Sequence, residues 1–446
     1  MPTRTVSVVS PARRVAAAVL RRVEQDDAYA DRALAAEATR SGLDARERAF
    51  ATQLAYGAVQ RRRTLDHVIA TCAGRPIEQL DPPVRDALRL GVLQLLFLDG
   101  VAPHAAVDQS VELVKATAGG RGHGLVNAVL RRAGREGPAL LDALDDTTPR
   151  GAAVRHSVPD WIAQLWWDAL GAEEARELLA VVNAPAESAL RVNALVADPA
   201  TVATELAQRE IAARPAPDPL ADSPDATLPE GLLLDTGFDL SGDALWQVGA
   251  LVAQSRAAMS AARLLAPPLG ARVLDLCAAP GGKATHLAAL VGRDGEVVAV
   301  ERNARRADAL RRTVKRLRAE PVVRVQTGDA AAPRDDGPFD AVLVDPPCSG
   351  LGTLQGRPDL RWRARADAIS ELAEVQLRIL TAGASALRPG GALVYCTCTI
   401  SPAENERVVE RFLASDDRFA HDRSMQTLPH RERTDGFFFA RLRRAV

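Results

Sequence analysis

The 446-residue chain contains few lysines, few aromatic residues and few cysteines. Lysine accounts for only three of its 56 basic residues, aromatic residues for 4% of the sequence, and cysteine for five positions. No apolar run is long enough to span a membrane, and the first residues lack the apolar core of a signal peptide. These absences argue against a membrane protein and a disulfide-rich secreted protein. We therefore expect a cytoplasmic protein with reduced thiols and no membrane partner.

The charges are nearly balanced, with a net charge of −1, so the chain as a whole has no strong attraction for nucleic acid. Basic residues nevertheless gather at residues 61–63, at residues 131–132 and between Arg305 and Arg318. Phosphate binding depends on such local patches rather than on the total charge. Each run is equally consistent with a solvated helix face, so the charge pattern alone leaves RNA binding open.

Residues 1–135 are predicted to form an all-α helical bundle. Between residues 11 and 133, apolar residues recur at helical spacing, for example over 15–23 and again over 84–98 after the helix-starting sequence Asp81-Pro82-Pro83. Glycine and proline at residues 41–42, 72–76 and 119–122 separate further helices. Short connections of this kind are typical of a bundle.

Two shorter regions follow the bundle. Residues 136–155 are predicted as a linker, and residues 156–244 as a small α+β domain with helices near 160–182 and an extended segment at 189–193. Five prolines from Pro215 to Pro229 predict a long surface loop. The three tryptophans at 161, 166 and 167 have helical spacing, and we expect them in a core rather than stacked on bases.

From residue 245 to residue 446, strand and helix patterns alternate, which is typical of an α/β, Rossmann-like domain with a doubly wound parallel sheet. Strands are expected at 272–276, 296–300, 322–326, 340–344 and 391–396. The apolar run at 436–442 is expected to be a closing antiparallel strand that pairs with the one near 391–398.

The first expected strand of this domain runs into a glycine-rich turn, in which the backbone can approach a ligand closely. Glu301 ends the next strand, where its carboxylate could accept both hydroxyls of a ribose, and Asp329 follows the third strand, where it could meet an adenine amino group. A turn and two acids on successive strands favour S-adenosylmethionine over a dinucleotide. The alternative is that both acids only cap the helices that follow them. The turn consists of Cys277, Ala278, Ala279, Pro280, Gly281, Gly282 and Lys283.

Three cysteines follow the ends of two further strands. Cys348 lies in the sequence Asp345-Pro-Pro-Cys348, and Cys396 and Cys398 lie in Tyr-Cys-Thr-Cys-Thr. Because open α/β sheets bind ligands at the carboxyl edge of their strands, these thiols should lie beside the glycine-rich turn. The combination indicates a thiolate that adds to carbon 6 of a cytosine and makes carbon 5 nucleophilic toward a methyl group. The base must be turned out of its stack, and Asp345 should either hydrogen-bond its edge or face the methyl donor.

Other interpretations of these residues are weaker. A buried cysteine is usually inert, but two thiols at a cofactor-binding edge are not typical of that role. A zinc site of Cys396, Cys398 and His421 or His430 would lack a second cysteine pair, so no metal is expected. The sequence Asp-Pro-Pro is also typical of enzymes that methylate exocyclic amines. Those enzymes follow it with an aromatic residue, where this chain has Cys348, so methylation of carbon 5 is favoured.

The first 135 residues resemble the NusB-type RNA-binding helical fold. The resemblance rests on residues 88–98, 107–113 and 126–132. In that fold, a basic face of the amino-terminal part contacts RNA, so the resemblance implies RNA binding here. The remaining alternative is a helical bundle that packs on the enzyme without touching RNA.

Nearly the whole chain resembles the RsmB/Sun-type RNA (cytosine-5-)-methyltransferases, which are class I S-adenosylmethionine enzymes. The resemblance implies that Cys398 is the nucleophile, that Cys348 assists release of the product, and that Asp345 joins the turn, Glu301 and Asp329 at the cofactor. Its motifs are residues 273–283, 345–352, 357–362, 388–391, 395–406 and 435–438.

Together with the NusB-like half, the resemblance implies an enzyme that acts on small-subunit ribosomal RNA, and a monomer is the default expectation. Methylation of transfer RNA or another RNA, and a non-catalytic RNA-binding role in ribosome assembly, remain as alternatives. The sequence departs from the family at two places. Cys396 stands where serine is usual, and residues 245–250 only partly contain the family's Gln-Asp pair.

Overall fold

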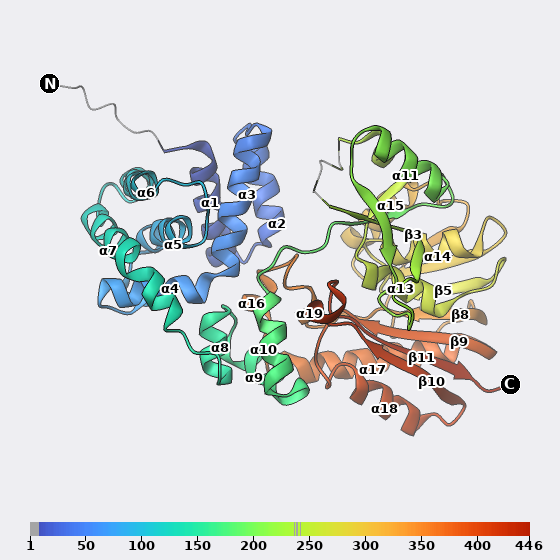
Figure 1. Cartoon of the computed structure of the whole chain (residues 1–446). Helices are drawn as coiled ribbons and strands as arrows, with labels where there is room; N and C mark the ends of the chain where they lie inside the picture. The colour runs from blue at the N-terminus through green and yellow to red at the C-terminus, as the bar shows by residue number, and fades with distance from the viewer. Residues whose placement is uncertain (1–8, 236, 238–239, 241) are drawn as a thin grey trace. The chain divides into compact units, whose positions relative to one another are not determined.

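The computed structural model describes residues 9–235, 237, 240 and 242–446, and the chain divides into two compact units (Figure 1). The first unit comprises the chain up to Ala184 together with the segment Leu354–Ala364. The second comprises Pro185–Thr353 and Arg365–Val446. The chain therefore leaves the second unit once, returns to the first, and then re-enters the second.

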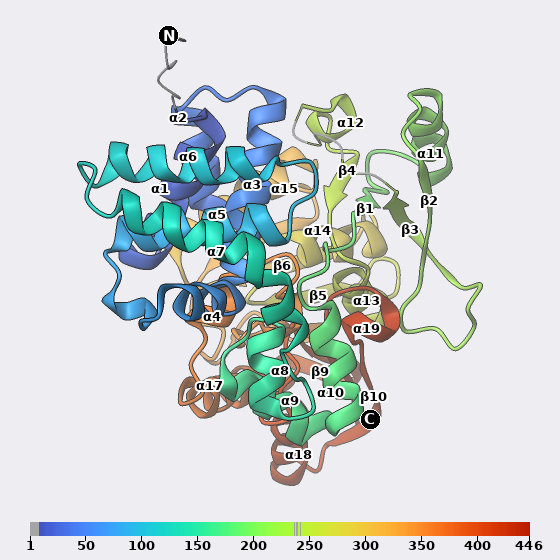
Figure 2. The ribbon, with the colours of Figure 1, turned by 60° about the vertical axis from the view of Figure 1, so that its left-hand side comes forward.

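The first unit is all-α, as predicted. Leu54, Leu65 and Leu88 are fully buried in its core, and α5 packs against α1, α6 and α7 (Figure 2). Proline occupies the first turn of α1, α5, α6 and α8, where its missing N–H costs no helical hydrogen bond. The helices are α1 (Pro11–Gln25), α2 (Ala30–Arg40), α3 (Ala45–Gln60), α4 (Arg62–Ala73), α5 (Pro82–Leu96), α6 (Pro103–Thr117), α7 (His123–Asp142), α8 (Pro149–Arg155), α9 (Asp160–Leu170) and α10 (Ala172–Val181), with a short 3-10 turn η1 (Ile77–Gln79).

The segment predicted as a linker is partly helical, because the end of α7 and all of α8 fall within it. The helices expected near 160–182 are confirmed as α9 and α10. Trp166 is fully buried, while Trp161 and Trp167 are half-buried, so one of the three tryptophans lies completely in the core.

The segment Leu354–Ala364, which contains α16 (Leu360–Arg363), is anchored in the first unit by Arg361. The buried Arg361 guanidinium donates to Asn183 Oδ1 (2.7 Å) and to the main-chain oxygens of Gln60 (3.1 Å) and Ser157 (3.0 Å). Trp362 Nε1 donates to the main-chain oxygen of Val59 (2.7 Å). The sequence pattern did not predict this excursion, because its contacts join residues far apart in the chain.

The second unit begins with a small antiparallel sheet of strand order β2-β3-β1-β4. The extended segment expected at 189–193 is confirmed, but the proline-rich loop is wrong in part, because Pro215 and Pro217 lie in β2 and Pro229 in β3. Strand β2 is at the edge of its sheet, where a residue without an N–H is tolerated. The elements of this part are β1 (Ala189–Val192), α11 (Pro199–Gln208), β2 (Ala213–Pro217), β3 (Thr227–Leu234), α12 (Ala244–Gln247) and β4 (Leu251–Ala253).

The larger sheet of the second unit has the order β10-β11-β9-β8-β5-β6-β7. Strands β9, β8, β5, β6 and β7 are parallel, while β11 pairs antiparallel with β9 and with β10, so the five expected strands and the closing strand are confirmed. Apolar residues of α13 and α14 pack on one face, and those of α17 and α18 on the other. The strands are β5 (Arg272–Leu276), β6 (Glu296–Glu301), β7 (Val323–Thr327), β8 (Phe339–Val344), β9 (Leu387–Thr397), β10 (Phe419–Gln426) and β11 (Phe438–Arg444); the helices are α13 (Arg256–Leu265), α14 (Gly282–Val291), α15 (Ala304–Arg316), α17 (Ala368–Ala386), α18 (Glu406–Ser415) and α19 (Pro429–Glu432).

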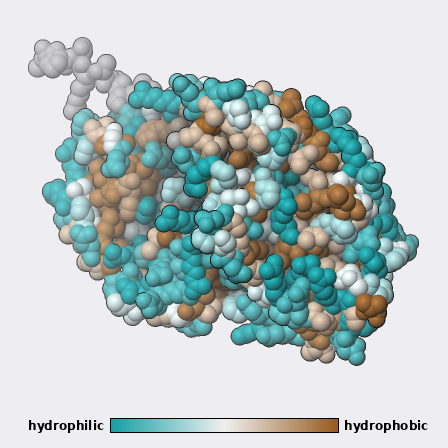
Figure 3. Space-filling view, turned by 45° about the vertical axis from the view of Figure 1, so that its right-hand side comes forward, coloured by the Kyte–Doolittle hydropathy of each residue, from teal (hydrophilic) through white to brown (hydrophobic). Residues whose placement is uncertain are grey.

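Few large apolar side chains face solvent. In the part of the chain that the structure describes, only Val248, Leu269 and Val446 are large hydrophobic residues with an exposed surface. Hydrophilic residues predominate on the face drawn in Figure 3. No helix among the described residues is both long enough and apolar enough to cross a membrane.

Candidate active site

The glycine-rich turn joins β5 to α14 at the carboxyl edge of the larger sheet. Cys277 has a φ of +66°, and Gly281, which precedes α14, has a φ of +112°. A Cβ atom at Gly281 would lie 2.8 Å from Leu310 Cδ1, so this position requires glycine. A Cβ at Gly282 would meet only Gln254, at 3.7 Å or more, so its backbone remains open to a ligand.

Glu301 and Asp329 follow β6 and β7 at the same edge. Glu301 is buried; its Oε1 accepts from the Asn303 amide (2.8 Å), and its Oε2 has no hydrogen-bond partner, although Arg306 lies 3.3 Å away. Asp329 is exposed, and its Oδ1 accepts from the Ala331 amide (3.0 Å). The Gly328 amide donates to the main-chain oxygen of Glu301 (3.2 Å), which brings the two loops together. Glu301 Oε2 thus accepts no hydrogen bond and could accept one from a ribose. The capping alternative does not apply to Asp329, because no helix follows it before β8.

Asp275, the last acid of β5, is an additional candidate that the sequence did not single out as a site residue. It is fully buried, and neither of its carboxyl oxygens has a hydrogen-bond partner. Burial and the nearby Asp345 raise the pKa of Asp275 well above its ordinary value. Two unpartnered oxygens beside a glycine-rich turn fit a ligand with a positively charged group. S-adenosylmethionine has two such groups, a sulfonium and an ammonium. An acid at the end of an apolar strand, directly before such a turn, is the sequence signal that could have identified it.

Lys283 and Asp345 form an ion pair that joins the turn to the loop after β8. Lys283 Nζ lies 2.7 Å from Asp345 Oδ2, and it also lies 5.0 Å from the centre of the Phe437 ring. Burial opposes the lysine's charge, but Asp345 outweighs this effect and raises the pKa of Lys283 above its ordinary value. A compact ammonium therefore lies between the glycine-rich turn and the loop after β8.

Cys348 and Cys398 lie face to face, with 3.3 Å between their sulfur atoms. The hydrogen bond to Cys398, together with burial, raises the pKa of the Cys348 thiol well above its ordinary value. Both side chains are half-buried, and all five cysteines of the chain are free thiols. The two sulfur atoms from separate strand ends are thus close enough to act on one substrate ring.

The remaining two thiols of this edge belong to Cys396 and Cys277. Cys396 Sγ lies 3.9 Å from Asp345 Oδ1, and burial together with Asp345 raises the pKa of the Cys396 thiol. Burial, followed by Asp345, also raises the pKa of Cys277. Among the residues that the structure describes, no group of three or more histidine, cysteine or acidic side chains has the arrangement of a metal site.

Backbone contacts between three loops hold the pair of cysteines in place. The Gly352 amide donates to the main-chain oxygen of Cys398 (3.0 Å), and the Gly436 amide donates to the main-chain oxygen of Gly352 (2.8 Å). A Cβ atom at Gly352 would overlap the main-chain oxygen of Gly436. Gly352, Gly436 and Phe437 were not predicted as site residues, although all three fall within motifs that carry the family resemblance.

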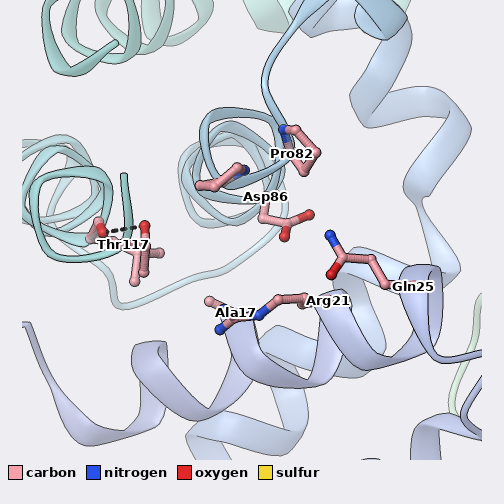
Figure 4. A pocket seen from close by; sticks show the side chains of 8 residues that line it. Ala17, Arg21, Gln25, Pro82, Asp86 and Thr117 are labelled. Atoms are coloured by element: carbon pink, nitrogen blue, oxygen red, sulfur yellow. Dashed lines mark hydrogen bonds between the residues drawn. The ribbon is translucent and has the colours of Figure 1, made fainter. Parts of the chain in front are cut away.

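A pocket in the first unit does not belong to this site (Figure 4). It lies between α1, α5 and α6, and Asp86 projects into it opposite Arg21 and Gln25. Burial raises the pKa of Asp86 to about 6. This pocket contains no cysteine and no glycine-rich turn, so it lacks the groups that the predicted chemistry needs.

The basic run at residues 61–63 is occupied by contacts within the first unit. Arg61 lies over Phe97, Arg62 lies over Trp362 and 3.6 Å from Glu24, and Arg63 pairs with Asp160 at 2.7 Å. Burial lowers the pKa values of Arg61 and Arg62. For these three residues, the structure favours an internal role over a free phosphate-binding patch.

Comparison with protein families assigns each part of the chain. A model described as 16S rRNA methyltransferase RsmB/F matches residues 262–443, and a NusB family model matches residues 10–135. The ferredoxin-like domain of RsmF/B-like methyltransferases matches residues 158–240. These matches confirm the predicted fold class of a NusB-like bundle, a small α+β domain and a Rossmann-like methyltransferase domain. The boundaries expected between the domains stay predictions.

Two relatives and one solved structure match almost the whole chain, and a second solved structure matches part of it. The probable ribosomal RNA small subunit methyltransferase B of Synechocystis sp. is 36% identical, with 97% of this chain and 99% of that protein aligned. Ribosomal RNA small subunit methyltransferase B of Thermus thermophilus is 37% identical over 97% of both proteins. The crystal structure of PH0851 superposes with a TM-score of 0.80 at 25% identity, over 98% of this chain and 100% of that one. NSun6 from Pyrococcus horikoshii with SFG shares the fold, with a TM-score of 0.57 at 22% identity, over 64% of this chain and 97% of that one.

Proposed function

Because the chain belongs to the 16S rRNA methyltransferase RsmB/F family, we propose that it methylates carbon 5 of a cytosine in small-subunit ribosomal RNA. The observation that carries this proposal is the pair of sulfur atoms 3.3 Å apart at the sheet edge that also bears the glycine-rich turn. Methylation of an exocyclic amine needs no thiol, whereas activation of carbon 5 needs one. The proposal therefore accounts for residues that the alternative leaves without a role.

S-adenosylmethionine, when bound, supplies an electrophilic methyl group. The backbone of residues 277–283 would line it, Glu301 would accept the ribose hydroxyls, and Asp275 offers its unpartnered oxygens to a cationic group. Asp329 and Asp345 complete the expected set. The two unpartnered oxygens of Asp275 support this assignment, since buried acceptors without partners are costly unless a ligand satisfies them.

In the proposed reaction, the Cys398 thiolate forms a bond to carbon 6 of the cytosine, which makes carbon 5 nucleophilic. After carbon 5 has received the methyl group, its proton leaves to a base, and the carbon–sulfur bond breaks to expel Cys398 as a thiolate. Cys348 assists this release. Asp345, held by Lys283 at 2.7 Å, hydrogen-bonds the edge of the base and so orients the ring. The target base must be turned out of any stack to reach these groups.

The proposal is tested by substituting each cysteine of the pair in the full-length protein and mapping the product by bisulfite sequencing of small-subunit ribosomal RNA. We expect Cys398→Ala to abolish protection of the target cytosine. We expect Cys348→Ala to accumulate a covalent RNA–protein adduct that survives a denaturing gel, and this adduct should disappear in the double variant. Cys72→Ala, which alters a buried thiol of the first unit, serves as the matched control and should keep full activity.

Full turnover by both single variants would exclude the assigned roles. A product methylated on an exocyclic nitrogen would favour the other class of methyltransferase, and methylation found only on transfer RNA would replace the proposed substrate. A protein that binds ribosomal RNA without any methyl transfer would correspond to the assembly factor considered above. The cytoplasmic location and the monomeric state expected from the sequence stay predictions.

A further inference from the structure

A buried carboxylate contacts the loop that carries Cys348. Glu404, in the loop between β9 and α18, is fully buried. Its Oε1 accepts from the Ser349 amide (2.8 Å) and from Gln376 Nε2 (3.1 Å), and its Oε2 accepts from Ser349 Oγ (2.6 Å). Ser349 is the residue next to Cys348, so the carboxylate holds this loop through both the backbone and the side chain.

The same network reaches the loop that carries Cys398. Ser349 Oγ lies 2.7 Å from Thr399 Oγ1, and Thr399 is the residue next to Cys398. Gln376 Nε2 also donates to the main-chain oxygen of Pro347 (2.9 Å), and Tyr395 donates its hydroxyl to the main-chain oxygen of Glu404 (2.6 Å). The Glu404 side chain is therefore linked through Ser349 to both cysteine loops.

Among the residues that the structure describes, no cation neutralises Glu404. All three donors to its carboxylate are neutral, and no lysine, arginine or histidine of the described residues forms an ion pair with it. The lysine of the site, Lys283, is paired with Asp345 instead. Because a buried carboxylate without a counter-ion is costly and exerts a strong field in a medium of low dielectric constant, its charge should act on the titratable groups around it. The Cys348 thiol is one of these groups, and Tyr395 is another.

We propose that Glu404 is a positioning residue that keeps Cys348 as a neutral thiol directed at Cys398. The proposal rests on the proposed function. In this state the Cys348 S–H donates to the Cys398 sulfur, which stabilises the Cys398 thiolate before it adds to the base and again when it is expelled. Release is then assisted by a hydrogen-bond donor, and Glu404 determines which of the two sulfurs carries the negative charge.

The other groups that face Cys348 also favour the neutral form of its thiol. They are Cys398 and Tyr395 from β9 and the loop after it, and Asp345 from the loop after β8, and none of them is a cation. The hydrogen bond with Cys398, burial and the charges of Cys398, Glu404 and Asp345 all raise the pKa of the Cys348 thiol. Removal of the charge on Glu404 should therefore lower that pKa, because the thiolate form would meet less repulsion.

The test measures how fast iodoacetamide alkylates Cys348 at different pH values, with the modified peptide quantified by mass spectrometry. The full-length protein carries Cys398→Ala throughout, so that only one sulfur of the pair remains. We expect Glu404→Gln, which is nearly isosteric, to lower the pH midpoint of alkylation by roughly one unit. Ser349→Ala removes the hydrogen bonds of the Ser349 hydroxyl to Glu404 and Thr399 but keeps the carboxylate, and it should leave the midpoint unchanged. Glu410→Gln, an exposed acid on α18, is the matched control.

An unchanged midpoint in Glu404→Gln, or an equal fall in Glu410→Gln, overturns the inference. A lower midpoint in Ser349→Ala overturns it as well, because it would show that loop geometry and not charge determines whether Cys348 is a thiol or a thiolate. The Ser349→Ala measurement remains decisive if Glu404→Gln does not fold. The assay contains neither RNA nor a methyl donor. Its outcome is therefore independent of whether the protein methylates carbon 5, which bisulfite mapping decides.

Discussion

Gly352 and Gly436 are the residues whose missing side chains allow the two cysteine loops to meet. The backbone of Gly352 donates to Cys398 and accepts from Gly436, so the loops after β8, after β9 and before β11 are tied at one point. The 3.3 Å separation of the sulfur atoms depends on this close approach as much as on the cysteines themselves. At the scale of single residues, glycines allow the loops to contact one another, and this contact brings the acids and thiols of the site together.

Gly352→Ala should therefore damage the site without removing any functional group. Its Cβ would overlap the main-chain oxygen of Gly436, so the loops must separate and the hydrogen bond to Cys398 must lengthen or break. We expect a loss of about 1–3 kcal/mol in the free energy of unfolding, together with a large loss of methyl transfer. Urea unfolding and a methyl-transfer assay measure the two effects. Gly134→Ala, whose Cβ meets no atom within 4 Å, is the control and should lose neither; normal activity of Gly352→Ala would contradict the role of this contact.

Helix α5 carries an acid that disfavours the folded state at neutral pH. Asp86 is buried, and its folded-state pKa of about 6 lies above the ordinary 3.8. A raised acid pKa means that the folded state has its full stability below pH 4 and loses stability as the pH rises through 6. Asp86→Asn should thus raise the free energy of unfolding by up to about 3 kcal/mol at pH 8 and by little at pH 4. Urea unfolding at both pH values tests this expectation.

The control for Asp86 is Asp81→Asn at the exposed start of the same helix, where no gain is expected at either pH. An equal gain at pH 4 and pH 8 would show that the effect of Asp86→Asn comes from packing. A loss at pH 8 would show that the weak contact of Asp86 with Arg89, 3.9 Å away, outweighs the effect of burial.

Elements with a strong local pattern were predictable, and residues whose role depends on distant partners were not. Strands β5, β6 and β8 are short apolar runs bounded by turn residues, and such patterns report directly on burial. Pro215 and Pro217 misled the prediction because an edge strand tolerates proline, and edge position is set by which strands pair. Cys348 and Cys398 could be found from strand ends and family resemblance. Glu404 could not, because its partner Ser349 lies 55 residues away in the chain.

Local sequence patterns also could not predict the path of the chain between the two units. The segment Leu354–Ala364 follows the Cys348 loop directly in sequence, yet it belongs to the first unit. Arg361 makes all its contacts there with neutral acceptors, and Trp362 donates to α3. The NusB-like unit is thus completed by residues from the methyltransferase part of the sequence. A cut at residue 135 would separate this segment from Val59 and Gln60, and a cut at residue 184 would also separate it from Ser157 and Asn183.

The proposed function requires the whole protein to bind RNA, and its phosphate contacts are not expected at residues 61–63. The run at 61–63 is engaged internally, whereas Arg121, Arg131 and Arg135, at or near α7, are exposed and form no ion pair with any residue that the structure describes. Replacing these three by glutamine should lower the slope of log Kobs against log salt concentration by about 2, since each phosphate contact contributes roughly 0.7–0.9. Filter binding of small-subunit ribosomal RNA to the full-length protein at several salt concentrations measures this slope.

Three arginines that already pair with carboxylates provide the matched control for that experiment. Arg365, Arg411 and Arg418 are exposed and bind Asp367, Glu374 and Asp416, so each contributes little net field at the surface. Their replacement by glutamine removes the same formal charge and should leave the slope nearly unchanged. If both triple variants lower the slope equally, attraction by total charge explains binding and the α7 region has no special part in it. If only the first does, the helical unit supplies localised phosphate contacts, as the resemblance to the NusB-type fold predicts.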